Sequence, residues 1–209
     1  MSKKVFIING DRDYNNLFKK FDFELTDHID KASLVVFTGG ADVSPNLYGD
    51  AQHPATWNSP YRDLQEQQLY LMARESGTPM VGICRGAQFL NVMNGGRMYQ
   101  DVGSHAIAHG HTLVDVENGQ EVLVTSTHHQ MMMPHESAKV VAIARQGSFR
   151  EWVQDCAIQR EEVSLEDYEV LFYEKSKSLC FQPHPEFVGA KWEPMKEYFH
   201  SLLQRYLGM

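Results

Sequence analysis

Cysteine is scarce in this sequence, and its spacing excludes two common structural uses. Three cysteines occur among 209 residues, at positions 84, 156 and 180, and no two of them form a CxxC pair. An odd and widely spaced set argues against a disulfide framework and against a structural zinc site. We therefore expect free thiols and a protein of the reducing cytoplasm.

Basic blocks and long apolar runs are missing as well. The formal net charge is −8 and no segment is rich in lysine and arginine, so we expect no nucleic-acid partner. The N-terminal segment has four consecutive apolar residues, 5–8, which is too few for a signal peptide or a spanning helix. The sequence thus predicts a soluble, cytoplasmic protein with no membrane partner.

The sequence does contain enough apolar material for one sizeable core. Apolar residues make up 43% of the chain, and a length of 209 residues fits a single domain. No internal repeat, low-complexity tract or linker rich in Pro, Gly and Ser interrupts it. We expect residues 1–209 to form one domain.

Apolar runs and helical stripes alternate in the first half of the chain. Residues 5–8, 34–37 and 80–83 are continuously apolar, which is typical of parallel strands buried on both faces. Residues 14–21 carry an apolar stripe at helical spacing, and 62–76 form a helix candidate that Gly77 and Pro79 end. This order predicts a doubly wound α/β sheet.

The second half is richer in strand patterns. Residues 111–129 surround an Asn118-Gly119 turn signal, 138–145 are β-rich, and 168–182 read as two strands joined by a polar turn. We expect these strands to extend or flank the central sheet. An apolar stripe from Trp192 to Tyr206 predicts a final amphipathic helix packed on it.

Cys84 stands between two glycines where an apolar run meets a helical one. A strand that passes directly into a helix forces a strained turn, and Gly82 and Gly86 leave room for its close approach. A cysteine at the apex lies at the helix N-terminus, which favours a thiolate, and the Arg85 N–H is free to face an oxyanion. The alternative is a buried core cysteine, because free cysteine is often buried.

Two further segments could supply the partners that a thiolate nucleophile needs. His184 and Glu186 are two residues apart at the end of a strand-like run, so the carboxylate could orient the imidazole. Gly39 and Gly40 follow a buried strand, and the Gly40 N–H could be the second oxyanion donor. Taken alone, each segment also fits an ordinary turn.

Several separated motifs together resemble one family. The chain carries, in order, "TGGADVSPNLYG", "YRD", "VGICRGAQFLNVMNGGRMYQDV", "TSTHHQ" and "FQPHPEF". This series resembles the class I glutamine amidotransferase-like hydrolases, and most closely the peptidase C26 branch typified by γ-glutamyl-γ-aminobutyrate hydrolase. The resemblance covers about residues 37–187. It implies a flavodoxin-like three-layer α/β sandwich with a mostly parallel central sheet and flanking β elements in the second half.

The resemblance also implies a set of site residues. It implies a catalytic triad of Cys84, His184 and Glu186, and an oxyanion hole from the backbone N–H groups of Gly40 and Arg85. A second set would contact the substrate: Gly39, Gln88, Ser126, His128 and His129. For the two histidines, hydrogen bonding within the fold is an equal alternative.

The sequence departs from the branch at three positions. Thr38 stands where the branch commonly has proline, Thr125 where it often has asparagine, and Pro183 where it has an aromatic residue. We expect all three at the wall of the pocket, where they would affect the identity of the substrate more than the chemistry.

A cluster of His105, His109 and His111 looks at first like a metal site. It has no nearby acidic or cysteine ligand at a zinc-like spacing, and the implied reaction has no use for a metal. We interpret the cluster as a solvated or structural loop and predict no metal site and no organic cofactor.

The implied activity is cysteine-dependent hydrolysis of a γ-glutamyl amide, either glutamine or a γ-glutamyl amine. A γ-glutamyl thioester would form, and glutamate and an amine or ammonia would be released. Besides this small-molecule substrate, a homodimer is compatible with the sequence. The alternatives are a glutaminase subunit that delivers ammonia to a synthetase in trans, and a catalytically inactive binding module.

Overall fold

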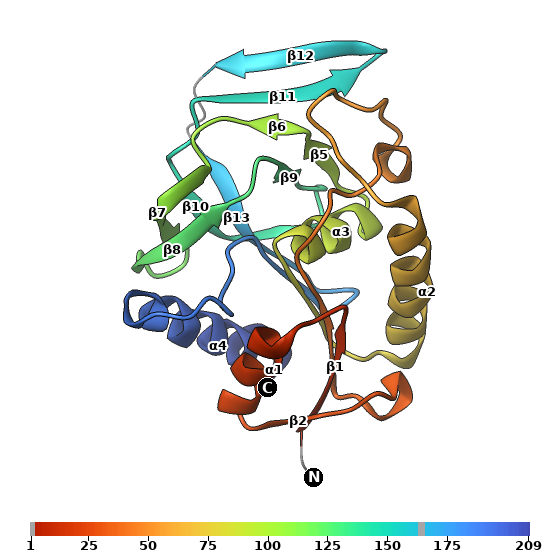
Figure 1. The fold of residues 1–209 in the computed structure, drawn as a ribbon, viewed down its shortest axis with the longest axis vertical. Helices are drawn as coiled ribbons and strands as arrows, with labels where there is room; N and C mark the ends of the chain where they lie inside the picture. Colours follow the sequence, from red (N-terminus) through yellow and green to blue (C-terminus); the bar gives the residue numbers. More distant parts are fainter. Residues whose placement is uncertain (1–2, 163–165) are drawn as a thin grey trace.

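A nine-stranded sheet forms the centre of the molecule in the computed structural model, which describes residues 3–162 and 166–209 (Figure 1). Its strand order is β2-β1-β3-β4-β14-β13-β10-β7-β8. The first five strands are parallel: β2 (Phe23–Leu25), β1 (Lys3–Ile8), β3 (Leu34–Phe37), β4 (Met80–Ile83) and β14 (Ser178–Phe181). The other four pair antiparallel: β13 (Asp167–Tyr173), β10 (Lys139–Ala144), β7 (Ala106–Asp115) and β8 (Glu121–Thr127).

Helices cover both faces of this sheet. In Figure 1, α1 (Arg12–Lys20) and α4 (Glu193–Leu207) lie on one side, and α2 (Pro60–Ser76) and α3 (Arg85–Met93) lie on the other. Along β3, Leu34 and Val36 pack into the core with α1 and α4, whereas Val35 and Phe37 pack into the core with α2 and α3. Both faces of the strand are thus buried, which explains its uninterrupted apolar run.

The predicted fold class is confirmed. The apolar runs form the parallel strands β1, β3 and β4, and the second half supplies the antiparallel strands. The Asn118-Gly119 turn joins β7 to β8, with Gly119 in the left-handed region at φ 73°.

Helix α2 begins at Pro60, two residues before the predicted start. It ends at Ser76 and is capped by Gly77, whose φ is 68°. No helix of the described residues is long and apolar enough to cross a bilayer.

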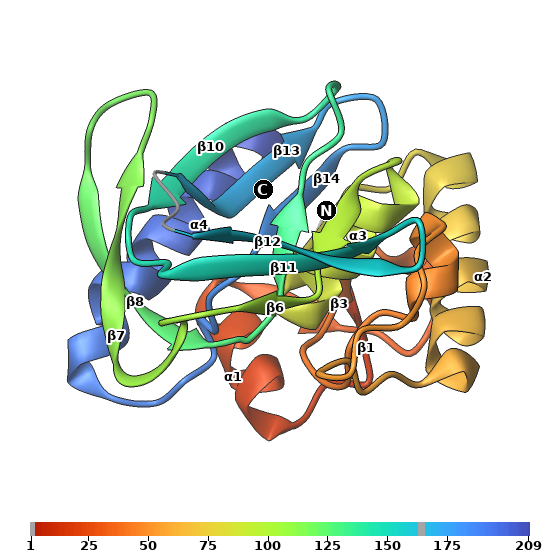
Figure 2. The same cartoon turned by 90° about the horizontal axis from the view of Figure 1, so that it is seen from above.

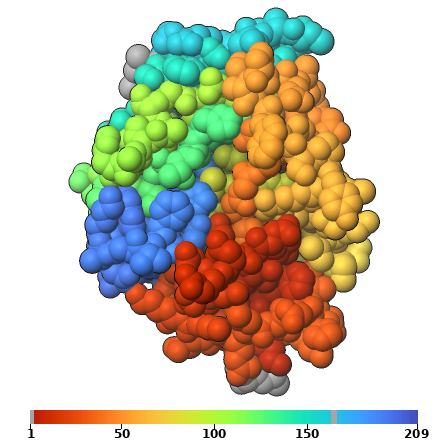
Figure 3. Space-filling model, in the orientation of Figure 1, coloured from red at the N-terminus to blue at the C-terminus, as the bar shows by residue number. Residues whose placement is uncertain are grey.

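Several short elements have no counterpart in the prediction. A three-stranded sheet contains β6 (Asp101–Val102), β11 (Phe149–Gln154) and β12 (Ala157–Glu162), and β5 (Arg97–Tyr99) pairs with β9 (Met131–Met133). Single 3-10 turns span η1 (Ile29–Lys31), η2 (Pro45–Tyr48) and η3 (Ala190–Trp192). Figures 1 and 3 show β11 and β12 at the end of the molecule opposite the N-terminus, and Figure 2 shows them crossing the fold when it is seen from above. These strands are too short or too polar to produce an apolar period.

The start of α1 offers a test of local stability. The Asp11 carboxylate accepts hydrogen bonds from the backbone N–H groups of Asp13 and Tyr14 at 2.8 and 3.3 Å. Asp11→Ala removes this cap, so we expect the free energy of unfolding to fall by about 1 kcal/mol in urea denaturation. Asp11→Asn retains a capping oxygen and should cost less. Equal losses in the two variants would contradict the capping role.

Candidate active site

Cys84 forms the sharp turn between β4 and α3 that the sequence predicts. Its φ is 52° and its ψ is −112°, a strained conformation for a residue with a side chain. A Cβ on Gly82 would lie 2.2 Å from the Gly86 carbonyl oxygen, and a Cβ on Gly86 would lie 2.0 Å from the Phe37 carbonyl oxygen. The backbones therefore approach so closely that only glycine fits on either side of the cysteine.

The position of Cys84 suits a nucleophile. Cys84 directly precedes the first turn of α3, where the helix dipole favours negative charge. The backbone N–H of Cys84 donates to the Phe181 carbonyl at 2.9 Å, which fixes the turn to the adjacent strand β14. The side chain is 9% exposed and reaches the wall of a cavity.

His184 and Glu186 form a close pair just beyond β14. The His184 Nδ1 lies 2.5 Å from a Glu186 carboxylate oxygen, so the carboxylate orients the ring. The His184 backbone N–H donates to the Thr125 hydroxyl at 2.7 Å. A Cβ on Gly39 would lie 2.8 Å from the His184 ring, which shows how closely the imidazole packs on the glycine loop.

Charges around His184 favour its protonated form. Burial lowers the pKa of His184, but the interactions with Cys84 and Glu186 raise this pKa by more than burial lowers it. The resulting pKa of His184 is about 10. The imidazole is therefore an imidazolium at neutral pH. This arrangement places a proton donor beside Cys84.

Two side chains that the sequence analysis did not assign to the site hold the glycine loop. The Gly39 N–H donates to the Tyr14 hydroxyl at 3.0 Å, so it is already used within the fold. Arg62 donates to the carbonyl oxygens of Gly39 and Thr38, each at 2.9 Å. Gly40 follows with φ 143° and lines the same cavity as Cys84. The loop backbone is thus fixed from both sides.

A buried charge network joins this loop to the cysteine turn. The Arg62 Nε donates to Glu66 at 2.6 Å, and the other Glu66 oxygen accepts from the Arg85 guanidinium, which also contacts Asp63. Burial, and next to it the charge of Arg62, lowers the pKa of Arg85 to about 10. The guanidinium therefore remains charged at neutral pH. In the sequence, only the "YRD" motif and the i, i+4 spacing of Arg62 and Glu66 could have indicated this network.

A cavity of about 320 Å³ opens beside the cysteine. Its lining includes Cys84 and five of the predicted site residues, Gly40, Arg85, Gln88, His128 and His129, together with Ala41, Asp42, Trp57, Thr127 and Gln130. The volume lies within the range of small-molecule sites. The structure therefore brings most of the predicted residues to one cavity.

The polar groups of the cavity are oriented by neighbours. The Gln88 side-chain N–H₂ donates to the Gln130 carbonyl and to the Gln182 side chain, each at 3.2 Å. The His129 Nε2 lies 3.2 Å from an Asp42 oxygen, and this hydrogen bond raises the pKa of His129. Both contacts place polar atoms at fixed positions in the wall.

Other predicted residues serve the fold. Ser126 does not line the cavity, and its buried hydroxyl donates to the His105 carbonyl. We expected Thr38, Thr125 and Pro183 at the pocket wall, and this is wrong because none of them lines the cavity. The Thr38 hydroxyl donates to the Ile8 carbonyl at 2.7 Å, and the Thr125 hydroxyl accepts from the His184 backbone.

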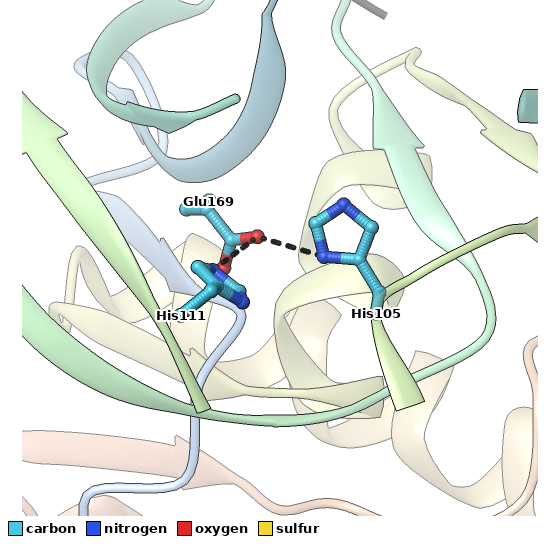
Figure 4. A group of neighbouring side chains, drawn as sticks. All are labelled: His105, His111 and Glu169. Atoms are coloured by element: carbon cyan, nitrogen blue, oxygen red, sulfur yellow. Dashed lines mark ion pairs between the residues drawn. The ribbon is translucent and has the colours of Figure 1, made fainter. Parts of the chain in front are cut away.

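We interpreted the His105, His109 and His111 segment as a solvated or structural loop; this is wrong for the loop, because His109 and His111 lie in strand β7, and solvation is wrong for His105 and His111. His105 and His111 are 0% and 4% exposed, because the segment runs into strand β7, whereas His109 is exposed. Acidic neighbours do exist: Glu169 lies beside both rings (Figure 4), and Asp167 lies beside the His105 ring. They come from β13, far along the chain, so spacing in the sequence could not reveal them.

The fold is that of class I glutamine amidotransferase-like proteins. A glutamine amidotransferase from Thermotoga maritima superposes with a TM-score of 0.60 over 98% of this chain and 85% of that chain, at 17% identity. A GMP synthase subunit from Thermoplasma acidophilum superposes with a TM-score of 0.59 over 100% and 97% of the two chains, at 14% identity.

Sequence comparison narrows this class to one family. The Peptidase C26 profile matches residues 20–154, and the chain belongs to that family. The glutamine amidotransferase-like protein YvdE of Lactococcus lactis is 38% identical over 117 residues, which is 47% of this chain. The matched part spans about half, 50%, of the length of YvdE. The resemblance inferred from the motifs is thereby confirmed at the level of the family.

The pKa of His184 predicts how stability depends on pH. Because the folded-state pKa of about 10 lies above the ordinary value of 6.5, the folded chain binds this proton more tightly than the unfolded chain. The stabilisation is complete below about pH 6.5 and is lost as the pH rises towards the folded pKa. In urea denaturation, the unfolding free energy of the wild type relative to His184→Gln should therefore decrease over this window. A difference independent of pH would contradict the assignment.

The charge network makes a second prediction. Glu66 is 0% exposed and lies between two guanidinium groups, so Glu66→Gln leaves buried positive charge uncompensated. We expect the free energy of unfolding to fall by about 3 kcal/mol in denaturant titration. The matched control is Glu75→Gln, an exposed position on the same helix, which should change it by less than about 0.5 kcal/mol. A small effect at Glu66 would refute the network.

Proposed function

We propose that this protein hydrolyses γ-glutamyl amides through a covalent thioester on Cys84. The observation that carries the proposal is the His184 and Glu186 pair beside a cysteine held on a strained strand-to-helix turn. The charged state of His184 supports it, because Cys84 and Glu186 raise the pKa of this imidazole against the effect of burial. A nucleophile, a proton carrier and an orienting carboxylate are the parts that acyl transfer requires.

In the first step, the Cys84 thiolate attacks the γ-carbonyl carbon of the substrate, and the carbonyl oxygen becomes an oxyanion. The backbone N–H groups of Gly40 and Arg85 are the proposed donors to this oxyanion. Both residues line the cavity with Cys84, and Arg62 fixes the loop that carries Gly40. The donors need no reorganisation during the reaction, which is the condition for effective electrostatic stabilisation.

The second half of the reaction uses His184 twice. The imidazolium donates its proton to the departing nitrogen as the C–N bond breaks, and an amine or ammonia leaves with the thioester in place. The neutral imidazole then takes a proton from water, which attacks the thioester carbon. The C–S bond breaks, glutamate is released, and the thiolate and imidazolium are restored.

The cavity wall suits the amino-acid end of a γ-glutamyl group. Asp42 and His129 present groups of opposite charge character at the cavity, as the α-ammonium and α-carboxylate of such a substrate would need. Gln88 is the proposed contact to the γ-glutamyl chain, since neighbouring acceptors hold its amide group. In this proposal Ser126 and Gly39 do not contact the substrate. Their hydrogen bonds to His105 and Tyr14 instead hold the segments around the site in place.

A glutaminase subunit is the second candidate function. In this case free glutamine is the substrate, and the ammonia passes to a synthetase on another chain. The similarity of the fold to a GMP synthase subunit favours this candidate. An inactive binding module is less favoured, because Cys84, His184 and Glu186 are all present and close together.

Substitution of the nucleophile tests the proposal. Turnover of a panel of γ-glutamyl amines and of free glutamine is followed by the release of glutamate and ammonia. Cys84→Ala should reduce turnover at least about a thousand-fold, because no other thiol reaches the carbonyl. Cys156→Ala is the matched control, since Cys156 is an exposed free cysteine and should retain full activity.

The outcomes of this experiment separate the candidates. Activity on γ-glutamyl amines by the isolated chain supports the hydrolase. Activity on glutamine that appears when a synthetase is added supports the glutaminase subunit. Unchanged turnover in Cys84→Ala would refute the thioester mechanism for both.

A further inference from the structure

A second cluster of functional groups lies buried behind the cavity. It contains His105 just before β7, His111 within β7, His128 just after β8, and Glu169 on β13. His105 and Glu169 are 0% exposed, and the two other histidines are each 4% exposed. Neither the proposed reaction nor the packing of the apolar core explains why four such polar side chains meet here.

The cluster has unused hydrogen-bonding capacity. In the described part of the chain, no well-aligned hydrogen bond satisfies the Nδ1 of His105, both ring nitrogens of His111, the Nε2 of His128 or either carboxylate oxygen of Glu169, which meet one another only in ion-pair contacts. Each such buried group costs about 1–3 kcal/mol when it is left unsatisfied. So many in one place indicates that these atoms bind something other than one another.

One ligand atom from each of His105, His111 and Glu169 lies within 4.8 Å of the others, and the same carboxylate also approaches His128. One Glu169 oxygen, Oε1, lies 3.1 Å from His111 Nε2, 3.6 Å from His105 Nδ1 and 3.6 Å from His128 Nε2. Figure 4 shows the His105 and His111 rings on either side of the carboxylate. In a tetrahedral site with metal–ligand bonds of about 2.0–2.1 Å, neighbouring ligand atoms are about 3.3–3.4 Å apart.

Contacts on the outer side of two rings support the same arrangement. The His105 Nε2 lies 3.2 Å from an Asp167 oxygen, which leaves Nδ1 for the interior. The His128 Nδ1 lies 2.9 Å from the Gln130 carbonyl oxygen, which leaves Nε2 for the interior. Histidines that bind metals are usually held in this way, with the second nitrogen on a carboxylate or a backbone carbonyl.

The charge of the cluster calls for a cation. Within the described residues, Glu169 forms ion-pair contacts with histidines alone, and no lysine or arginine reaches it. An ionised carboxylate removed from water is costly unless a positive charge lies beside it. A divalent ion would supply that charge and would at the same time bind the unpartnered nitrogens.

We propose that His105, His111, His128 and Glu169 bind one divalent transition-metal ion, and that Zn²⁺ fits this ligand set best. Three imidazole nitrogens and one carboxylate oxygen are typical zinc ligands. Four protein ligands complete a tetrahedral shell, so the ion has a structural role and no open position for substrate. The site is separate from the proposed hydrolysis and does not depend on it.

The ion would stabilise the wall of the cavity. His128 contributes to the cluster and to the cavity lining, and its neighbour Gln130 accepts the hydrogen bond from Gln88. Strands β7 and β13 are not adjacent in the sheet, since β10 lies between them. The metal would therefore link two strands and the loop at residues 128–130 across the antiparallel half of the fold.

Metal binding by the full chain tests the proposal. The protein is stripped with a chelator, its fold is checked by circular dichroism, and it is titrated with Zn²⁺ and, separately, with Co²⁺. We expect one ion per chain, a visible absorption spectrum typical of tetrahedral Co²⁺, and an unfolding temperature that rises with the concentration of Zn²⁺. Elemental analysis of the protein purified without chelator should also find the metal.

Variants localise the binding. His111→Asn and Glu169→Gln each remove one ligand and should weaken Zn²⁺ binding at least about a hundred-fold. His109→Ala is the matched control, because His109 lies on the same strand with an exposed side chain, and it should bind as the wild type does. Failure of a folded, stripped wild type to bind Zn²⁺ and Co²⁺ would overturn the proposal, as would unchanged affinity in a folded His111→Asn variant. Neither readout involves turnover, so these results are independent of the test on Cys84.

Discussion

The buried carboxylate of Glu66 is the interaction on which the geometry of the candidate active site depends. One of its oxygens accepts a hydrogen bond from Arg62, which fixes the carbonyls of the glycine loop, and the other accepts from Arg85, the residue that follows Cys84. The two proposed oxyanion donors thus come from different loops that share one anion. Because Glu66 and Arg85 are removed from water and Arg62 is largely so, the ion pairs are only weakly screened and they fix the separation of the two segments.

The parallel and antiparallel halves of the sheet contribute different parts of the candidate site. The parallel half places the glycine loop, the cysteine turn and the histidine segment at the carboxyl ends of neighbouring strands β3, β4 and β14. This is the edge at which α/β sheets bind their ligands. The antiparallel half adds a second layer of control, because Thr125 holds the His184 backbone and the loop at 128–130 forms a wall of the cavity.

Much of this could be predicted from the sequence, and the exceptions have physical reasons. Continuous apolar runs identified β1, β3 and β4, and local motifs identified Cys84 and His184 with Glu186. The network of Arg62 and Glu66 was missed because periodicity assigns helix charges to solvent, and their burial follows only from tertiary contacts. The acidic partner of His111 was missed for the same reason, since Glu169 meets it only after β13 and β7 have folded together.

The position of β14 has a consequence for the order in which the candidate site is assembled. This strand follows every other strand of the sheet along the chain, yet it lies between β4 and β13 in the middle of the sheet, and it leads directly to His184. During synthesis the thiol of Cys84 therefore emerges long before its imidazole partner. Cys84 of the nascent chain therefore lacks its proposed imidazole partner until β14, the last strand of the sheet in chain order, has paired with β4 and β13.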